Sequence, residues 1–151
     1  MVVKMKKIKK DAILPTRGSA EAAGYDLYAN SIDGGAGKWD LMFIAPGETV
    51  KIGTGIAAEI PSGYFGGIYA RSGLATKQGL APANAVGVID CDYKGEIIVA
   101  LHNYGNEEQT IYKDDRIAQL VIQPYLSFDI EEVDELSETE RGEGGFGSTG
   151  K

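Results

Sequence analysis

Short apolar segments separated by turn residues are the feature of this sequence that most constrains its fold. Such segments span 50–52, 56–60 and 64–70, and Gly-Thr-Gly or Pro-Ser-Gly stands between them. Strands of this length, with a turn signal about every eight to twelve residues, are typical of all-β sandwiches and barrels. The 21 glycines, spread between the apolar segments, favour the same conclusion because they supply turns and interrupt helices. The sequence therefore predicts an all-β domain with one short helix near 75–77.

The length and charge of the chain limit what this β domain can be. With 151 residues it is most simply one domain with a single core. The formal net charge of −7 argues against a protein that binds nucleic acid regardless of sequence, since such binding needs a basic face. Five lysines lie within residues 1–10, and we expect them on an edge strand, where charge discourages aggregation.

Cysteine and histidine are too scarce for several kinds of site. Cys91 and His102 are the single residues of their types, which excludes an intrachain disulfide framework and leaves a zinc site short of ligands. No apolar run approaches the ~18 residues of a membrane-spanning helix, and the start carries no signal-peptide core. We expect a soluble, intracellular protein without a membrane partner, whose metal, if it has one, is a hard cation held through oxygens.

A polar stretch between two apolar strands holds the strongest candidate for chemistry. Residues 88–89 and 97–101 are predicted strands, and two acids, a tyrosine and a glycine stand between them, as in a hairpin connection. A carboxylate where a strand meets a turn is rigidly supported yet faces solvent, as a general base requires. The residues alone do not rank Asp90 above Asp92, and both are also common as plain turn acids.

Arg71-Ser72-Gly73, directly before the predicted helix, is suited to an anion. It offers a charged fork, a hydroxyl and backbone N–H groups, which are the groups that bind phosphate. The alternative is a helix N-cap formed by Ser72, with Arg71 as a surface charge.

Two further polar residues interrupt predicted strands. Gln119 lies within the apolar strand 116–122, so its amide must find partners inside the protein or face a ligand. Asp26 lies in the predicted strand 22–29 and points to the face opposite Leu27, either toward a site or simply toward solvent.

The C-terminal part divides into an acidic segment and a glycine-rich tail. Residues 129–143 carry eight acids and form either a partly exposed last strand or an acidic linker. Residues 141–151 have too few apolar side chains to build a core, and we expect them to be mobile. Arginine, hydroxyls and glycines suit phosphates, and Phe146 suits stacking on a base. We predict a β domain over 1–136 and a mobile lid over 137–151; the alternative is a plain flexible terminus.

Five stretches of the chain resemble the motifs of the trimeric dUTP nucleotidohydrolase (dUTPase) family. Each motif is weakly specific by itself, but the five in order cover nearly the whole chain and are highly specific together. They are Ala23-Gly24-Tyr25-Asp26-Leu27; Arg71-Ser72-Gly73-Leu74-Ala75; Gly87-Val88-Ile89-Asp90 through Tyr93-Lys94-Gly95-Glu96; Arg116-Ile117-Ala118-Gln119-Leu120; and Arg141-Gly142 through Gly144-Gly145-Phe146-Gly147-Ser148-Thr149-Gly150.

The resemblance implies a distorted jelly-roll β-fold in a homotrimer, with each active site built from three chains and closed by the C-terminal tail of a neighbouring subunit. It implies a dUTP diphosphatase, which hydrolyses dUTP to dUMP and pyrophosphate by water attack on the α-phosphorus. That activity limits uracil incorporation into DNA and supplies dUMP for thymidylate synthesis. The implied cofactor is Mg²⁺, held mostly by the triphosphate oxygens. The implied location is the cytoplasm of a bacterium, or of the host cell of a phage or virus.

The resemblance also implies residue roles. Asp90 resembles the general base, which ranks it above Asp92, and Tyr93 resembles the tyrosine that packs under the deoxyribose and leaves no room for a 2′-hydroxyl. Asp26 resembles the acid that contacts the magnesium ion indirectly, through water. The other implied substrate-binding residues are Arg71, Ser72, Gly73 and Gln119 for the phosphates, Asn84 with Gly87, Val88 and Ile89 of the 84–98 hairpin for the uracil, and Arg141, Phe146, Gly147, Ser148 and Thr149 in the lid.

Two alternatives differ from this function. In the related dCTP deaminases a glutamate follows the third motif, whereas Ala100 stands at that place here, and Arg71-Ser72-Gly73 lacks the paired serines of the deaminases. The other alternative is a non-catalytic, dUTPase-like module that senses nucleotide or holds a protein partner. The complete set of proposed site residues favours an enzyme.

Overall fold

A computed structural model describes residues 1–32 and 41–145, and this part of the chain contains twelve strands and one helix. The prediction of an all-β fold with one short helix is thereby confirmed. No helix among the described residues is long and apolar enough to cross a membrane. The strands are β1 (Lys4–Lys7), β2 (Tyr25–Tyr28), β3 (Ser31–Ile32), β4 (Leu41–Ile44), β5 (Thr49–Gly53), β6 (Ile56–Glu59), β7 (Tyr64–Tyr69), β8 (Leu80–Pro82), β9 (Gly87–Ile89), β10 (Ile98–Asn103), β11 (Gln109–Tyr112) and β12 (Arg116–Pro124); the helix is α1 (Ser72–Gln78).

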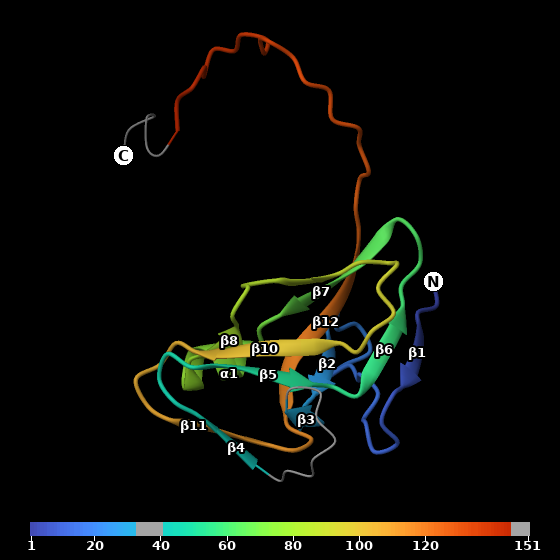
Figure 1. Cartoon of the computed structure of the whole chain (residues 1–151), viewed down its shortest axis with the longest axis vertical. Coiled ribbons are helices and arrows are strands. Elements are labelled where there is room, and N and C mark those ends of the chain that lie inside the picture. The colour runs from blue at the N-terminus through green and yellow to red at the C-terminus, as the bar shows by residue number, and fades with distance from the viewer. Residues whose placement is uncertain (33–40, 146–151) are drawn as a thin grey trace.

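The strands form two four-stranded sheets and two two-stranded ribbons, all antiparallel (Figure 1). One sheet has the order β3-β5-β10-β8 and the other β2-β12-β7-β9, while β1 pairs with β6 and β11 pairs with β4. Neighbours in these sheets are far apart in sequence, as in a jelly roll. The lysine-bearing strand β1 has β6 as its partner, at an edge, as the sequence predicts.

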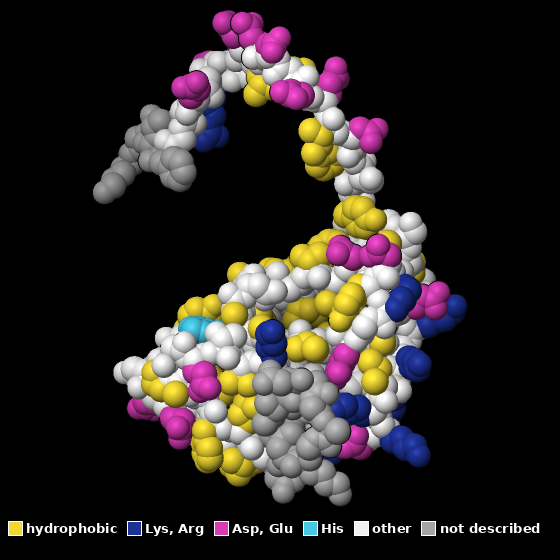
Figure 2. Space-filling view, in the orientation of Figure 1, with side chains coloured by type: hydrophobic (Ala, Val, Ile, Leu, Met, Phe, Trp, Pro, Cys, Tyr) yellow, Lys and Arg dark blue, Asp and Glu magenta, His cyan; other side chains and the backbone are white. Residues whose placement is uncertain are grey.

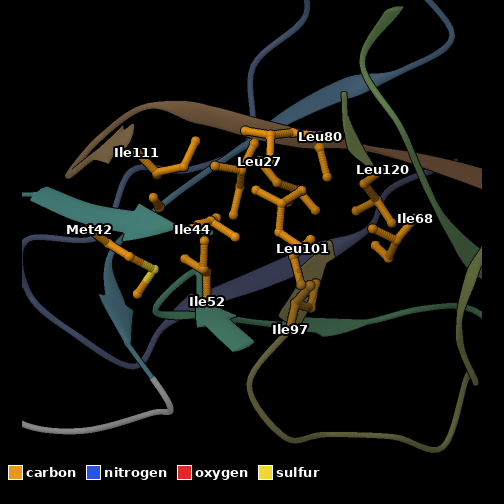
Figure 3. Packing of buried hydrophobic residues seen from close by; sticks show 14 of the residues in the cluster. Leu27, Met42, Ile44, Ile52, Ile68, Leu80, Ile97, Leu101, Ile111 and Leu120 are labelled. Atoms are coloured by element: carbon orange, nitrogen blue, oxygen red, sulfur yellow. The ribbon is translucent and has the colours of Figure 1, made fainter. Parts of the chain in front are cut away.

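One apolar cluster fills the space between the sheets (Figure 3). Alternation along the strands creates it: in β4, Met42 and Ile44 are buried while Leu41 and Phe43 are exposed. Burying one Ile or Leu side chain stabilises a fold by about 1.5–3 kcal/mol, so a cluster of this size dominates the stability. Its members are Leu27, Ala29, Met42, Ile44, Ile52, Ala58, Ile60, Ile68, Leu80, Ile97, Val99, Leu101, Ile111, Ile117, Ala118 and Leu120.

The predicted hairpin between 88–89 and 97–101 is wrong. Strand β9 pairs with β7, through Gly66↔Ile89 and Ile68↔Gly87, whereas β10 pairs with β5 and β8 in the other sheet. The connection over residues 90–97, here called the Asp90 loop, therefore crosses from one sheet to the other. The turn residues indicate a reversal of the chain but carry no information on the partner of each strand.

The chain leaves the sheets after β12 as an extended arm, residues 125–145, that projects from the body of the molecule (Figure 1). It forms no strand, so of the two interpretations of this acidic segment the linker is correct. Figure 2 shows acidic side chains spaced along the arm, with apolar side chains between them. The apolar ones are strongly exposed: Leu126 is 90% and Ile130 88% accessible.

Candidate active site

A cleft of about 420 Å³ at one edge of the β2-β12-β7-β9 sheet gathers most of the predicted phosphate ligands. Asp26 comes from β2, Arg71 follows β7, and Arg116 begins β12. We call this region the cation cleft. Its lining comprises Gly18, Ala22, Ala23, Gly24, Asp26, Arg71, Ser72, Gly73, Arg116 and Gln119.

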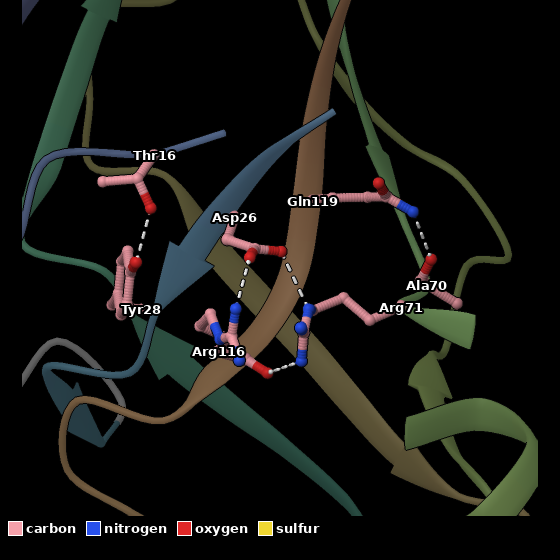
Figure 4. A network of polar contacts seen from close by, with 7 residues as sticks. All are labelled: Thr16, Asp26, Tyr28, Ala70, Arg71, Arg116 and Gln119. Atoms are coloured by element: carbon pink, nitrogen blue, oxygen red, sulfur yellow. Dashed lines mark hydrogen bonds and ion pairs between the residues drawn. The ribbon is translucent and has the colours of Figure 1, made fainter. Parts of the chain in front are cut away.

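Asp26 holds two arginines of the cation cleft in place (Figure 4). The Nε of Arg71 donates to Asp26 Oδ1 at 2.8 Å, and Nη1 of Arg116 donates to Asp26 Oδ2 at 3.2 Å. Arg71 also donates from Nη1 to the backbone oxygen of Arg116 at 3.2 Å. The Asp26 side chain is 14% and the Arg71 side chain 24% exposed, so solvent screens this ion pair little, whereas Arg116 is 51% exposed and its pair is screened more. The carboxylate therefore orients two cations whose remaining N–H groups stay available to an anion.

The register of β12 between its two neighbours brings this cluster together. Gln119 lies opposite Asp26 of β2 and opposite Tyr69 of β7, two residues before Arg71. The Nε2 of Gln119 donates to the backbone oxygen of Ala70 at 2.8 Å, and its Oε1 lies where a side chain at position 24 would be. Gly24 is thus the residue that lets the amide lie across the cleft, and the Gln119 amide is partly satisfied internally.

The start of α1 differs from the capping alternative. Ser72 is the first helical residue, and Arg71 occupies the cap position without a side-chain capping bond. Ser72 and Gly73 are exposed and line the cleft, while Arg71 is ion-paired and not a free surface charge. The helix ends at Gln78 and is capped by Gly79, whose φ of 67° is the left-handed conformation that terminates many helices.

A second, smaller hollow of about 170 Å³ lies beside the Asp90 loop, which forms part of its lining. The Asp90 carboxylate is exposed directly after β9, at the junction of strand and turn expected from the sequence. The hollow is lined by Val88, Ile89, Asp90, Tyr93, Glu96 and Ile98.

Backbone contacts define the shape of the Asp90 loop. The N–H of Tyr93 donates to the Asp90 carbonyl at 3.2 Å, and the Tyr93 hydroxyl donates to the Glu96 carbonyl at 2.9 Å. The ring lies against Gly95, where an added Cβ would be 2.6 Å from Tyr93 Cζ. The neighbouring Cys91 raises the pKa of Tyr125, whose hydroxyl lies 4.0 Å from the Cys91 Sγ.

The turn before β9 presents Asn84 to solvent. The N–H of Val86 donates to the Asn84 carbonyl at 2.6 Å, and Ala85 takes a positive φ of 59° to close the turn. Gly87 is buried, and a Cβ added there would be 3.1 Å from the Ile68 Cβ and 3.4 Å from the Asn84 Nδ2. Asn84 therefore lies beside the start of β9.

The predicted site residues fall into three places. Asp26, Arg71, Ser72, Gly73 and Gln119 meet in the cation cleft, and Asp90 and Tyr93 meet with β9 around the second hollow. Arg141 lies in a turn far out on the arm, where its Nε donates to the Gly144 carbonyl at 2.8 Å. Phe146, Gly147, Ser148 and Thr149 lie outside the described residues.

The two clusters of one chain are far apart. Asp90 follows Ile89, which pairs with Gly66 near the start of β7, whereas Arg71 follows the end of β7. At about 3.3 Å per residue, the Cα atoms of Asp90 and Arg71 lie roughly 20 Å apart.

Sequence reasoning gave no role to two residues that the structure places in these clusters, Arg116 and Glu96. Arg116 stands at the head of the fourth motif, which was a signal for its place beside Gln119. Glu96 ends the third motif, but its contact with the turn between β5 and β6 has no local signature.

Comparisons with known proteins agree with this arrangement. The family model described as dUTPase matches residues 10–150. The chain is 50% identical to a deoxyuridine 5'-triphosphate nucleotidohydrolase of Nautilia profundicola over 151 residues, which is all of both chains. Its structure is similar to that of the Staphylococcus bacteriophage 80alpha dUTPase with dUPNHPP, with a TM-score of 0.84, 29% identity and 99% of each chain covered. The fold is also that of a mutant dUTPase from phage phi11 of S. aureus, described with a structural Mg(II) ion (TM-score 0.75, 24% identity, 89% and 98% covered).

The matched family model spans both clusters and the arm, and the relative matches from end to end. The chain therefore belongs to the dUTPase family.

Proposed function

We propose that this chain hydrolyses dUTP to dUMP and pyrophosphate in active sites shared between copies of the chain. The separation of the two clusters carries the proposal. The Asp90 loop and the cation cleft lie roughly 20 Å apart at opposite ends of β7 and line two separate hollows that share no residue, so neither hollow of one chain contains both the acid and the arginines. A homotrimer in which the loop of one chain faces the cleft of another supplies both.

The cation cleft binds the triphosphate in this proposal. Arg71 and Arg116 neutralise phosphate charge, and the Ser72 hydroxyl, the Gly73 N–H and the Gln119 amide donate to phosphate oxygens. Mg²⁺ bound together with the substrate would supply further stabilisation of the charge that develops on the phosphates. The Asp26 oxygens each accept from one arginine and keep a lone pair for a water of that ion, so the residues fit an indirect contact.

The Asp90 loop supplies the chemistry and the selection of the nucleoside. The Asp90 carboxylate accepts a proton from the water that attacks the α-phosphorus. Tyr93 packs under the deoxyribose, and Asn84 with the backbone of Gly87, Val88 and Ile89 reads the uracil.

The body over 1–136 and the lid over 137–151 are the two functional parts of this proposal. Arg141 brings positive charge to the phosphates when the arm of a third chain closes, and Phe146, Gly147, Ser148 and Thr149 contact the base and phosphates. A closed lid excludes water other than the nucleophile.

The decisive test of the reaction is pyrophosphate release from dUTP, dCTP, dTTP and UTP in the presence of Mg²⁺. We expect release from dUTP alone. Ammonia from dCTP would make the chain a deaminase, and the absence of turnover with tight dUTP binding would make it a sensing module.

Shared sites are tested by mixing two inactive variants, Asp90→Asn and Arg71→Ala. Mixed trimers contain sites that combine the intact loop of one variant with the intact cleft of the other. Random assembly completes about one quarter of the sites, so we expect about a quarter of the wild-type activity after co-expression. Activity that stays at the level of the separate variants would place both clusters in a site within one chain.

A further inference from the structure

The Asp90 loop is anchored to the body at its far end by Glu96. The Oε1 of Glu96 accepts a hydrogen bond from the N–H of Gly55 at 2.7 Å, in the turn between β5 and β6. The next residue strengthens this attachment: the N–H of Ile97 donates to the Ile56 carbonyl at 2.8 Å, and the Thr54 Oγ1 donates to the Ile97 carbonyl at 2.8 Å. The Glu96 carboxylate therefore links the loop to the turn between β5 and β6, beside the backbone contacts of Ile97.

The absence of a side chain at Gly53 leaves space for the Glu96 carboxylate. A Cβ added to Gly53 would be 2.5 Å from Glu96 Oε1 and 2.6 Å from Ser31 Oγ, so the glycine leaves the room that the carboxylate occupies. Ser31 is 2% exposed, and its hydroxyl has no hydrogen-bond partner among the described residues. The Glu96 side chain is half-buried, and its Oε1 and the Ser31 hydroxyl lie beside the same position, the one that a Cβ on Gly53 would occupy.

The backbone of Glu96 also contacts Tyr93. The Tyr93 hydroxyl donates to the Glu96 carbonyl at 2.9 Å, and the ring rests on Gly95, the residue before Glu96. The place of the ring therefore depends on where residues 95–96 lie, and the carboxylate bond to Gly55 sets that place.

We propose that Glu96 is a positioning residue that fixes Tyr93 at the distance from the sugar where a 2′-hydroxyl no longer fits. The inference rests on the proposed function, in which Tyr93 packs under the deoxyribose. Exclusion by contact depends on small displacements, because a ring that can retreat makes room for an extra oxygen. Loss of the carboxylate anchor lets the ring retreat, while the Asp90 base on the other side of the loop keeps its support from β9.

The test compares Glu96→Ala, which removes the anchor, with Glu96→Gln, which keeps an oxygen acceptor for the Gly55 N–H. For each variant, kcat and KM are measured with dUTP and with UTP. We expect Glu96→Ala to lower the ratio of kcat/KM for dUTP to that for UTP by about tenfold or more, mainly through KM, and Glu96→Gln to restore it. The matched control is Glu48→Ala, since Glu48 also accepts from a backbone N–H (Ala45, 2.8 Å) but lies outside the loop.

A wild-type ratio in folded Glu96→Ala overturns the inference while the proposed function stands. If Glu96→Ala does not fold, Tyr93→Phe removes the hydroxyl link to the Glu96 carbonyl and keeps the ring, and it must lower the ratio as well. An unchanged ratio in Tyr93→Phe overturns the inference, as does equal loss in Glu48→Ala. Wild-type protein that does not hydrolyse dUTP overturns the proposed function, and the inference falls with it.

Discussion

The cation cleft and the Asp90 loop are positioned by different kinds of contact. In the cleft, side chains hold one another: Asp26 pairs with Arg71 and Arg116, and Gln119 ties the strand before Arg71. In the loop, backbone groups and glycines set the shape, and the Asp90 carboxylate extends into solvent. The cleft keeps two like charges together in the free chain, before the phosphates of the proposed substrate bind, so it needs a counter-charge. The loop presents one acid and needs only a rigid support.

Because of this difference, we expect substitutions in the cleft to change both stability and activity, and substitutions in the loop to change activity alone. In the proposed roles, Asp26 balances charge in the free chain and so contributes to the fold as well as to binding, whereas the exposed Asp90 contributes to the reaction alone. The four predictions below follow this division, from the largest expected effect to the smallest.

Asp90→Asn should have the largest effect on turnover and almost none on stability. Removal of the base while its shape is kept should lower kcat by on the order of 10²–10⁴-fold. Binding of a non-hydrolysable dUTP analogue and the melting temperature should stay near those of the wild type, because the side chain is exposed. Steady-state kinetics measures kcat, calorimetric titration measures binding of the analogue, and a melting curve gives the melting temperature. Near-normal turnover would exclude Asp90 as the general base.

Deletion of 141–151 tests whether the two regions suffice once they are assembled. We expect a loss of kcat/KM on the order of 10²-fold or more, because the charge of Arg141 and the exclusion of water are lost. Since β12 ends at Pro124, before the deleted residues, the proposed trimer should persist on size-exclusion chromatography. Dissociation of the trimer would instead assign a structural role to the tail.

Asp26→Asn should affect stability and binding together, unlike Asp90→Asn. The substitution leaves Arg71 and Arg116 without their counter-charge at a site that is 14% exposed, and we expect a cost of about 2 kcal/mol, between the values for exposed and buried pairs. A few degrees of melting temperature and a raised KM for dUTP are the measurable outcomes. A variant with weaker binding but unchanged melting temperature would contradict the division drawn above.

The smallest effect is expected at Asp11, an exposed acid. Its ion pair with Lys113 serves as a comparison for the less exposed ion pairs of the cleft. The hydrogen bond and ion pair from Lys113 lower the pKa of Asp11 below its usual 3.8. A lowered pKa in the folded state adds stability above the unfolded pKa, and this contribution disappears as the pH falls through the folded pKa.

Melting curves of wild type and Asp11→Asn at pH 6 and pH 3 test this sign. The wild type should melt slightly higher at pH 6, and the difference should shrink at pH 3. A difference that grows on acidification would contradict the direction of the pKa shift.

The sequence predicts the fold class well because the pattern that indicates a strand lies within the strand itself. Alternation around Ile52 and the apolar run before Gln119 mark β5 and β12, and the helix lies where 75–77 suggest it. Strand partners are not local, and the hairpin assumed around Asp90 is wrong because Ile89 pairs with Gly66 in a different sheet from β10.

The candidate site shows the same limit. The spacing of the motifs identifies Asp26, Arg71 and Gln119, but their ion pairs and hydrogen bonds join residues 45 to 90 positions apart. Arg116 and Glu96 stand in the fourth and third motifs, but their contacts, with Asp26 and with Gly55, join residues far apart in the sequence and have no local signature. Residue roles taken from the family motifs stay predictions until the variants above are measured.

The arm after β12 makes the proposed lid a tethered ligand. Twelve residues, 125–136, reach on the order of 40 Å when extended, and acids along them repel one another and favour such extension. A tether of this kind holds its end at a local concentration of about millimolar around any site within reach. The lid can therefore bind weakly by itself, close often, and still release product after each turnover. Its occupancy should follow tether length and ionic strength, so that shortening the arm would slow the enzyme without changing any residue that touches the nucleotide.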